Sequence, residues 1–243
     1  MYKIGDGEDT YLQGSAFSSG YSFRFTGSQK NEASDRVNWL KARIRGKSII
    51  HVGCCDHLPI IEKKRTRGYW LHEHLVKNAA HIVGVDTDAE GVRFLVEELK
   101  QENIYCADLL RDEIPQVYAR SWDYLFLGEV LEHIDNPVAF LQQLREKYSG
   151  RISELIVTVP NAFKYKNVRN ALKRRERINS DHRYWFTPYT LAKVISCAGC
   201  IPREFTFVTS YPIEDPIPTA WLKKLFLDRY SAFRETLVMT ATL

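Results

Sequence analysis

The sequence lacks the glycine-rich loops that bind phosphate groups in nucleotide sites. Its 13 glycines form neither the G-x-G-x-x-G turn of a dinucleotide site nor the glycine and Lys-Ser/Thr loop of nucleoside triphosphatases. A cofactor that contains adenosine but no phosphate is therefore more consistent with the sequence.

Cysteine and long apolar runs are also scarce. The odd set of five cysteines lacks zinc-finger spacing, so we expect free thiols at Cys54, Cys55, Cys106, Cys197 and Cys200. No run is long enough to span a membrane, and the polar start predicts no secretory signal. We expect a cytoplasmic protein. Lys and Arg exceed Asp and Glu by only 34 to 30, which by itself does not indicate a nucleic-acid partner.

Short apolar segments alternate with amphipathic ones through most of the chain. We predict helices at 71–80, 89–100, 138–148, 187–198 and 220–230, and strands at 48–52, 81–86, 103–108, 122–127, 154–159 and 204–209. Strands that recur after helices imply right-handed βαβ units. The predicted fold class is therefore α/β, a Rossmann-like doubly wound sheet that is mostly parallel, with an antiparallel C-terminal strand from 234–243.

The predicted organisation is one α/β domain with additions at two places. Residues 1–45 are interpreted as an N-terminal arm followed by a helix at 29–45, and residues 46–243 as the domain itself. A basic segment at about 163–185 interrupts the alternation. Because it follows a strand end, we interpret it as a lid over the ligand, although an RNA contact is the alternative.

The residues that follow the strands are expected to meet at one edge of the sheet, where ligands of doubly wound folds bind. A glycine, Gly53, follows the first strand, and acids follow the next two, Asp86 and Asp108. An acid in such a position can accept hydrogen bonds from ribose hydroxyls or an adenine amino group. The alternative is that both acids only cap helices or turns. Together the three residues predict a bound nucleoside without phosphate.

Two sequence blocks carry a family resemblance. The block Glu129-Val130-Leu131-Glu132-His133-Ile134-Asp135-Asn136-Pro137, followed by Val159-Pro160-Asn161-Ala162-Phe163, resembles class I S-adenosylmethionine (SAM)-dependent methyltransferases. It is similar to the branch that contains the ubiquinone-biosynthesis O-methyltransferases. The resemblance covers about residues 45–210 and includes the later segment 181–188.

The resemblance implies SAM as the cofactor, bound by the residues at the strand ends. These are His51, Gly53, Cys54, Asp86, Thr87, Asp108, Leu109, Gly128 and Glu129. One departure concerns the first motif, which in the family reads acid-x-Gly-x-Gly-x-Gly. Here those positions hold His51, Gly53, Cys55 and His57. Only the first glycine remains, so side chains stand where the family lets backbone approach the cofactor.

A Glu-x-x-Glu-His cluster follows the fourth predicted strand. If it opens a helix, Glu129, Glu132 and His133 share one face, and a divalent cation would relieve their crowding. Together with His182, the cluster resembles the metal site of small-RNA 3′-terminal 2′-O-methyltransferases and of metal-dependent quinone-pathway enzymes, which implies Mg, Mn or Zn. In the metal-free alternative, His133 or His182 is the catalytic general base.

These features predict a SAM-dependent methyltransferase that methylates an oxygen of a small-molecule or sugar- or polysaccharide-linked acceptor. One alternative is an RNA ribose 2′-O-methyltransferase, which the basic segment favours and the lack of an RNA-binding module opposes. Another is a degenerate methyltransferase fold that binds without catalysis. We do not expect a nucleic-acid partner, and the sequence does not indicate an oligomeric state.

Overall fold

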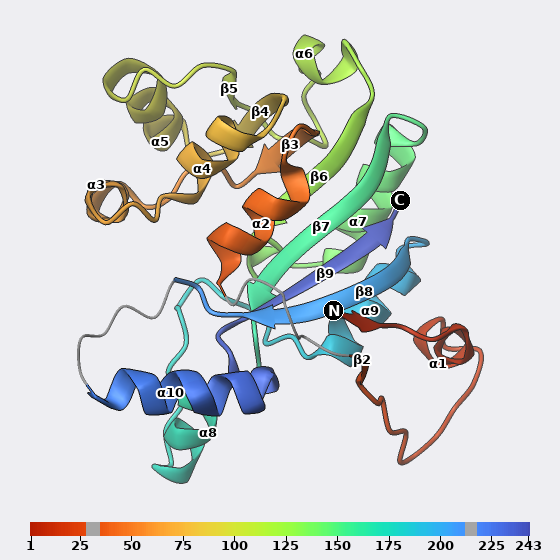
Figure 1. Cartoon of the computed structure of the whole chain (residues 1–243). Coiled ribbons are helices and arrows are strands. Elements are labelled where there is room, and N and C mark those ends of the chain that lie inside the picture. The colour runs from red at the N-terminus through yellow and green to blue at the C-terminus, as the bar shows by residue number, and fades with distance from the viewer. Residues whose placement is uncertain (28–34, 212–217) are drawn as a thin grey trace.

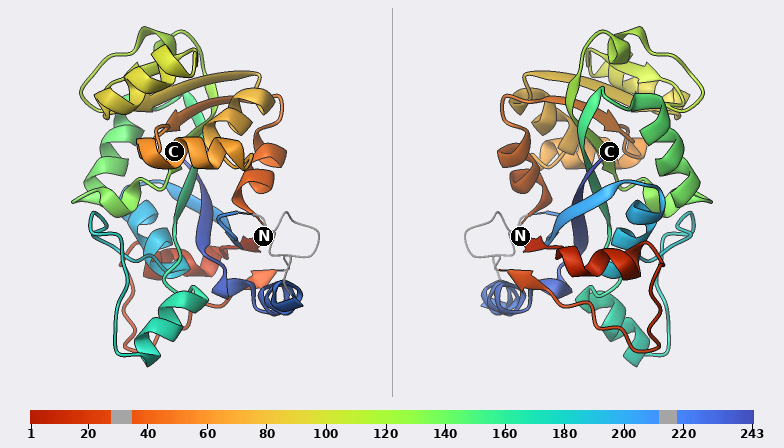
Figure 2. Two further views of the ribbon diagram at one scale, coloured as in Figure 1. Left: turned by 90° about the vertical axis from the view of Figure 1, so that its left-hand side faces the viewer. Right: turned by 90° about the vertical axis from the view of Figure 1, so that its right-hand side faces the viewer.

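The computed structural model of the chain describes residues 1–27, 35–211 and 218–243. Within these residues, nine strands form one sheet in the order β2-β1-β8-β9-β7-β6-β3-β4-β5, and helices lie on both of its faces (Figures 1 and 2). The strands are β1 (Tyr2–Lys3), β2 (Thr26–Gly27), β3 (Ser48–Val52), β4 (His81–Asp86), β5 (Ile104–Cys106), β6 (Trp122–Gly128), β7 (Ile152–Pro160), β8 (Ile201–Val208) and β9 (Thr236–Thr242).

The central strands are parallel, as the alternation predicts. β3 pairs with both β4 and β6, and the outer pairs β4–β5 and β6–β7 are also parallel. The C-terminal strand β9 inserts between β7 and β8 and is antiparallel to both. The predicted fold class is therefore confirmed. The structure adds the short strands β1 and β2, which extend the β8 edge.

Strand order places the ligand edge at the centre of the sheet. The chain runs outward from β3 through β4 to β5 and then returns to β6 on the other side of β3. In doubly wound sheets this reversal opens a crevice at the carboxyl ends of the two diverging strands. Val52 of β3 is in register with Val85 of β4 and Leu127 of β6. Gly53, Asp86 and Gly128 therefore end neighbouring strands.

Helices bury the apolar side chains that alternate along the strands. On one face, α2 (Arg36–Ile44) and α4 (Leu71–Asn78) pack on Ile49 and Phe126. On the other face lie α1 (Asp9–Leu12), α6 (Pro115–Tyr118), α7 (Pro137–Tyr148) and α9 (Pro188–Cys197), around Ile50 and Leu125. Because adjacent strand residues point to opposite faces, Ile49 and Ile50 belong to different cores.

Several predicted helix boundaries change in the structure. The helix expected at 29–45 is α2, which begins at Arg36; residues 28–34 lie outside the described residues. The helix expected at 89–100 is shorter: α5 (Ala89–Arg93) continues as one π-helical turn, Phe94–Glu98. The helix expected at 220–230 is α10 (Pro218–Arg229). The structure adds α3 (Leu58–Thr66) and α8 (Tyr165–Leu172), and 3-10 turns at Asp6–Glu8, Leu131–His133 and Ser231–Phe233.

The N-terminal arm joins the domain instead of standing apart from it. β1 pairs with β8, and Lys193 of α9 donates a hydrogen bond to the carbonyl of Tyr11, 2.6 Å away. The rings of Tyr11 and Tyr21 stack at 4.2 Å between centroids. The described residues include no helix long and apolar enough to cross a membrane.

Candidate active site

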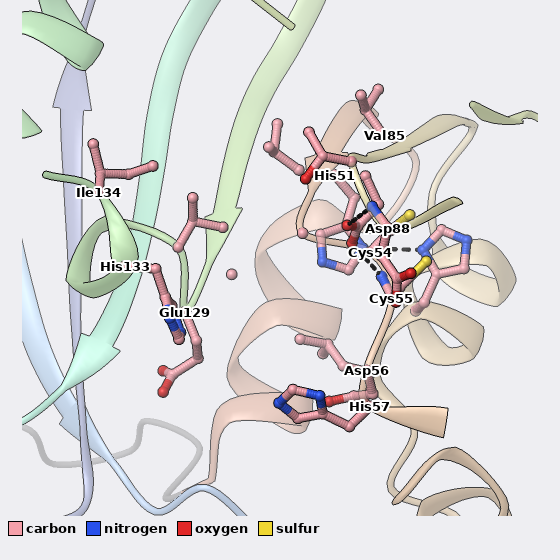
Figure 3. Close-up of a pocket in the computed structure, with 18 of the residues that line it drawn as sticks. His51, Cys54, Cys55, Asp56, His57, Val85, Asp88, Glu129, His133 and Ile134 are labelled. Carbon is pink, nitrogen blue, oxygen red and sulfur yellow. Dashed lines mark hydrogen bonds between the residues drawn. The ribbon is translucent and has the colours of Figure 1, made fainter. Parts of the chain in front are cut away.

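A cavity of about 830 Å³ opens at the carboxyl ends of β3, β4, β5 and β6. Its lining includes all nine residues that the sequence predicts at the cofactor, namely His51, Gly53, Cys54, Asp86, Thr87, Asp108, Leu109, Gly128 and Glu129. His133 and His182 line it as well. In Figure 3, Glu129 and His133 form one wall, and the loop from Cys54 to His57 forms the wall opposite. The side chains of Cys55 and His57 therefore leave the groove open.

Gly53 occupies a backbone position that only glycine suits. Its φ is +71°, and a Cβ there would lie 2.7 Å from Cγ2 of Val130. The residue thus turns the chain sharply at the end of β3 while β6 and its loop pass close by. This turn brings the backbone to the cavity, which is the role that the first motif glycine predicts.

Asp86 holds the loop that follows Gly53. Its Oδ2 accepts a hydrogen bond from the backbone N–H of Cys55 (2.8 Å), and its Oδ1 accepts one from the N–H of Asp88 (3.1 Å). Burial raises the pKa of the Asp86 carboxyl, while these backbone donors act in the opposite direction. Each carboxylate oxygen has a second lone pair, so Asp86 can position the loop and still accept from a ligand.

Asp108 fits the turn interpretation as well as the binding one. Its Oδ1 accepts from the N–H of Leu110 (2.9 Å), and Nε of Arg111 lies 3.4 Å from its Oδ2. Leu109, the next residue, is buried. The structure therefore brings Asp86 and Asp108 to one cavity, as the sequence predicts, with each acid also ordering its own loop.

His51, which stands in place of the family's first acid, is buried and has a histidine partner. Its Nδ1 lies 2.9 Å from Nδ1 of His72 on α4, and its ring stacks on Phe126 at 4.9 Å. Burial lowers the pKa of His51, and burial lowers that of His72 to about 4. Both rings are therefore neutral near pH 7, and the acid of the family is replaced by an uncharged pair.

Glu129 does not open a helix, so the prediction of one helical face for Glu129, Glu132 and His133 is wrong. Glu129 has a φ of +60°, and only Leu131–His133 form a 3-10 turn. Its Oε1 lies 3.3 Å from a guanidinium nitrogen of Arg36, at the start of α2. A side chain other than glycine or asparagine rarely adopts this left-handed conformation. The turn directs the Glu129 carboxylate to Arg36 instead of into a helix.

Glu132, His133 and His182 form a tight group beside Glu129. One ligand atom of each of the three lies within 4.8 Å of the others. Nε2 of His182 is 4.0 Å from Oε1 of Glu132, and the two imidazole rings meet edge to face at 4.6 Å. The loop carrying His182 is held in place because the N–H of Arg183 donates to the carbonyl of Glu132 (2.7 Å). The described atoms of Glu129 lie outside this group.

Burial dominates the electrostatics of this group. Glu132 is fully buried, and neither of its carboxylate oxygens has a hydrogen-bond partner among the described residues. Burial, with the nearby charge of Glu129, raises the pKa of Glu132 to about 9. Burial together with His133 and Lys164 lowers the pKa of His182, whose Nδ1 is also unpartnered in the described structure. Buried oxygen and nitrogen atoms without partners are the donor set that a divalent cation satisfies.

The structure also adds residues that the sequence reasoning missed. Arg36 is 8% exposed and lines the cavity with its guanidinium, and Lys64 and Tyr211 line it from distant segments. Arg36 lies 93 positions before its partner Glu129, and no spacing in the sequence indicates that contact. The contact of His72 with His51 likewise depends on the packing of α4 against β3.

The basic segment expected as a lid carries α8. Lys164, just before this helix, places its ammonium 4.3 Å from the centre of the Trp185 ring. It also affects the cavity electrostatically, since it helps to lower the pKa of His182. The segment therefore borders the cavity, and closure over a ligand remains a prediction.

Comparison with known proteins identifies distant relatives. The chain is 22% identical over 192 residues to a ubiquinone biosynthesis O-methyltransferase of Aeromonas salmonicida, covering 74% of this chain and 75% of the relative. A protein of the same description from Acinetobacter baumannii is 22% identical over 189 residues, covering 73% and 75%. No protein-family model matches the chain.

Solved structures show the same fold. The small RNA methyltransferase HEN1 superposes with a TM-score of 0.54 at 16% identity, covering 90% of this chain and 27% of that one. The magnesium protoporphyrin IX methyltransferase of Synechocystis, solved with S-adenosylhomocysteine, gives 0.51 at 14% identity, covering 85% and 79%. Sequence and fold together support a SAM-dependent methyltransferase.

Proposed function

We propose that the chain transfers the methyl group of SAM to a hydroxyl oxygen of a small-molecule or sugar-linked acceptor. The observation that carries this proposal is the position of Glu132, His133 and His182, whose ligand atoms gather within 4.8 Å at the cavity that Gly53 and Asp86 border. A proton-accepting group thus lies beside the expected cofactor edge. The distant O-methyltransferase relatives support the choice of oxygen as the methylated atom.

The cavity suits the proposed cofactor. The bare Cα of Gly53 allows close approach, while Asp86 and Asp108 offer carboxylate oxygens to ribose hydroxyls and an adenine amino group. Arg36 supplies a buried cation for a carboxylate. When bound, SAM supplies an electrophilic methyl group, so that a C–O bond to the acceptor forms as the C–S bond breaks and its electron pair stays on sulfur.

In the site without a metal, the histidines supply the base. His182 has a pKa below its usual value and is therefore neutral at pH 7, so a ring nitrogen can take the proton of the acceptor hydroxyl. His133 meets it edge to face and helps to fix its ring. Holding both reactants in one cavity also contributes, because bound reactants gain effective molarity.

The unpartnered atoms of Glu132 and His182 fit a divalent cation such as Mg, Mn or Zn. Glu132, His133 and His182 would hold it, whereas Glu129, the fourth predicted ligand, lies 3.3 Å from a guanidinium nitrogen of Arg36. Such a cation lowers the pKa of a bound hydroxyl. An acceptor with two adjacent hydroxyls would suit this site best.

The ribose of an RNA 3′ end is the second candidate acceptor, since it also offers adjacent hydroxyls. The observation that favours it is the basic segment around α8, with seven Lys or Arg against one Glu between residues 163 and 177. Binding through phosphates would fall steeply as salt rises.

Calorimetry with SAM, with and without EDTA, tests the cofactor. A panel of catechols, sugars and short RNAs then tests the acceptor. We expect micromolar SAM binding, and methyl transfer to a diol that His182→Ala abolishes and the control His81→Ala, at the exposed start of β4, retains. Absence of SAM binding would instead support a degenerate fold that does not catalyse.

A further inference from the structure

Two helices outside the active site expose an unusual number of apolar side chains. α8 and α10 lie together at one end of the molecule, away from α5 and α6 (Figures 1 and 2). Tyr165 of α8 meets Phe226 of α10 edge to face, with 5.9 Å between ring centroids. A groove of about 510 Å³ runs between the two helices.

Large apolar side chains are exposed on both helices of this pair. On α8 they recur three and four positions apart, which places Tyr165, Val168 and Leu172 on one side, with Leu172 82% exposed. On α10, Trp221 is 66% exposed and Leu225 is 55% exposed. A folded monomer seldom leaves so many large apolar side chains together in water.

The segments that form these two helices are also rich in cations. The segment 163–177 carries seven Lys or Arg against one Glu, and α10 adds Lys223, Lys224 and Arg229 against Asp228. Lys166 and Arg169 line the groove, and neither forms an ion pair with another described residue. The one acid of the segment, Glu176, accepts from the indole N–H of Trp185. Little of this positive charge is therefore neutralised within the described part of the chain.

We propose that the face formed by α8 and α10 docks on an anionic lipid bilayer, with Trp221, Leu225 and Leu172 entering the interface and the surrounding Lys and Arg contacting lipid phosphates. Helices that combine exposed apolar residues with lysine and arginine bind in the interfacial plane without spanning the membrane. Tryptophan and tyrosine favour the same depth. Charge complementarity selects the bilayer over an apolar protein groove, because the apolar side chains are surrounded by cations.

The docking face is continuous with the active site. Lys164 lines the groove between α8 and α10, and the charge of Glu129 in the active-site cavity acts on its ammonium. Docking would therefore place the active-site cavity near the membrane surface. The proposal does not depend on methyl transfer, and binding to lipid can be measured without cofactor.

The test is co-sedimentation of the full chain with phosphatidylcholine vesicles that contain or lack phosphatidylglycerol. We expect binding only to the anionic vesicles, with a loss as ionic strength rises. The variant Lys166→Gln/Arg169→Gln should bind about 30-fold more weakly, since each cation near such a surface contributes roughly fivefold. Its control, Arg93→Gln/Lys100→Gln at the far end of the molecule, removes the same charge and should bind like the native chain.

The apolar contribution has its own pair of variants. Leu225→Ser should weaken vesicle binding about tenfold, the effect of withdrawing one leucine from an apolar phase, whereas Val96→Ser, 41% exposed on the π-helical turn, should not. Equal binding to neutral and anionic vesicles, or equal losses in the two charge variants, would overturn the proposal. So would binding to RNA at the same salt with none to vesicles.

Discussion

The Nε2 atom of His182 lies 4.0 Å from Oε1 of the fully buried Glu132, although the two residues are 50 positions apart. No described group donates a hydrogen bond to either oxygen of that carboxylate. A buried carboxyl in such a place keeps its proton unless a cation joins it. This pair therefore links the stability of the protein, its pH dependence and its proposed chemistry.

The Glu132→Gln variant should be more stable than the native chain at alkaline pH in the absence of metal. The pKa of Glu132 is raised to about 9 in the folded state, mainly by burial, against 4.5 for the ordinary group. Its contribution to stability is thus fully present below pH 4.5 and is lost as the pH rises towards 9. Glutamine cannot ionise, so the variant should not lose this stability.

Thermal unfolding in EDTA at pH 5 and pH 8.5 measures the melting temperatures of the variant and the native chain. We expect them to differ by several degrees at pH 8.5. Equal melting temperatures at both pH values would contradict the raised pKa.

Cation binding at this group should release a proton and strengthen with pH. Below pH 9 a cation must displace the proton of Glu132, so affinity should rise up to tenfold per pH unit. Titration with Mn²⁺ in buffers of different ionisation enthalpy counts the protons released. His182→Ala and Glu132→Gln should each lose at least tenfold in affinity, whereas His81→Ala should not change it. A pH-independent affinity would exclude Glu132 as a ligand.

The fold could be predicted because the sequence patterns that indicate it are local. Each central strand is a short apolar run that ends at a glycine or an acid, and the edge at which Gly53, Asp86 and Gly128 meet follows from parallel topology alone. The antiparallel β9 was likewise expected from the β-rich C-terminal segment.

What the sequence could not predict depends on contacts between distant segments. Spacing of three and four predicts a helical face for Glu129 and Glu132, but Glu129 adopts a left-handed turn and its carboxylate contacts Arg36. The partnership of His51 with His72 also requires α4 to pack on β3. Local periodicity contains no information about either pairing.

Two glycines of similar conformation allow the destabilising effect of steric crowding to be distinguished from that of backbone strain. Gly53 and Gly150 have φ values of +71° and +73°, but only at Gly53 would a Cβ meet another atom, Cγ2 of Val130 at 2.7 Å. Gly150→Ala should cost about 1–2 kcal/mol in the free energy of unfolding from strain alone. Gly53→Ala should cost about 1–3 kcal/mol more from overpacking.

Urea denaturation compares the free energies of unfolding of these two variants, and calorimetry compares their affinities for SAM. We expect Gly53→Ala to weaken SAM binding at least tenfold, because the loop to Cys55 must shift, and Gly150→Ala to leave it unchanged. If both variants bind SAM like the native chain, the turn after β3 is not the cofactor loop.

The His72→Gln variant should resist acid better than the native chain. Burial lowers the pKa of His72 to about 4, so the unfolded chain takes up a proton near pH 6.5 before the folded one does. The stability contributed by the neutral ring is present above pH 6.5 and is lost as the pH falls towards 4, by up to about 3 kcal/mol.

Glutamine keeps a hydrogen-bonding group near His51 without this titration. Its unfolding free energy should therefore fall less between pH 7 and pH 5 than that of the native chain or of His74→Gln. His74 is a control on the same helix that is only half-buried and contacts the carbonyl of Gly68 instead of another histidine. An identical decrease in all three proteins would mean that the His51–His72 pair is protonated in the folded state and that the first motif carries a positive charge.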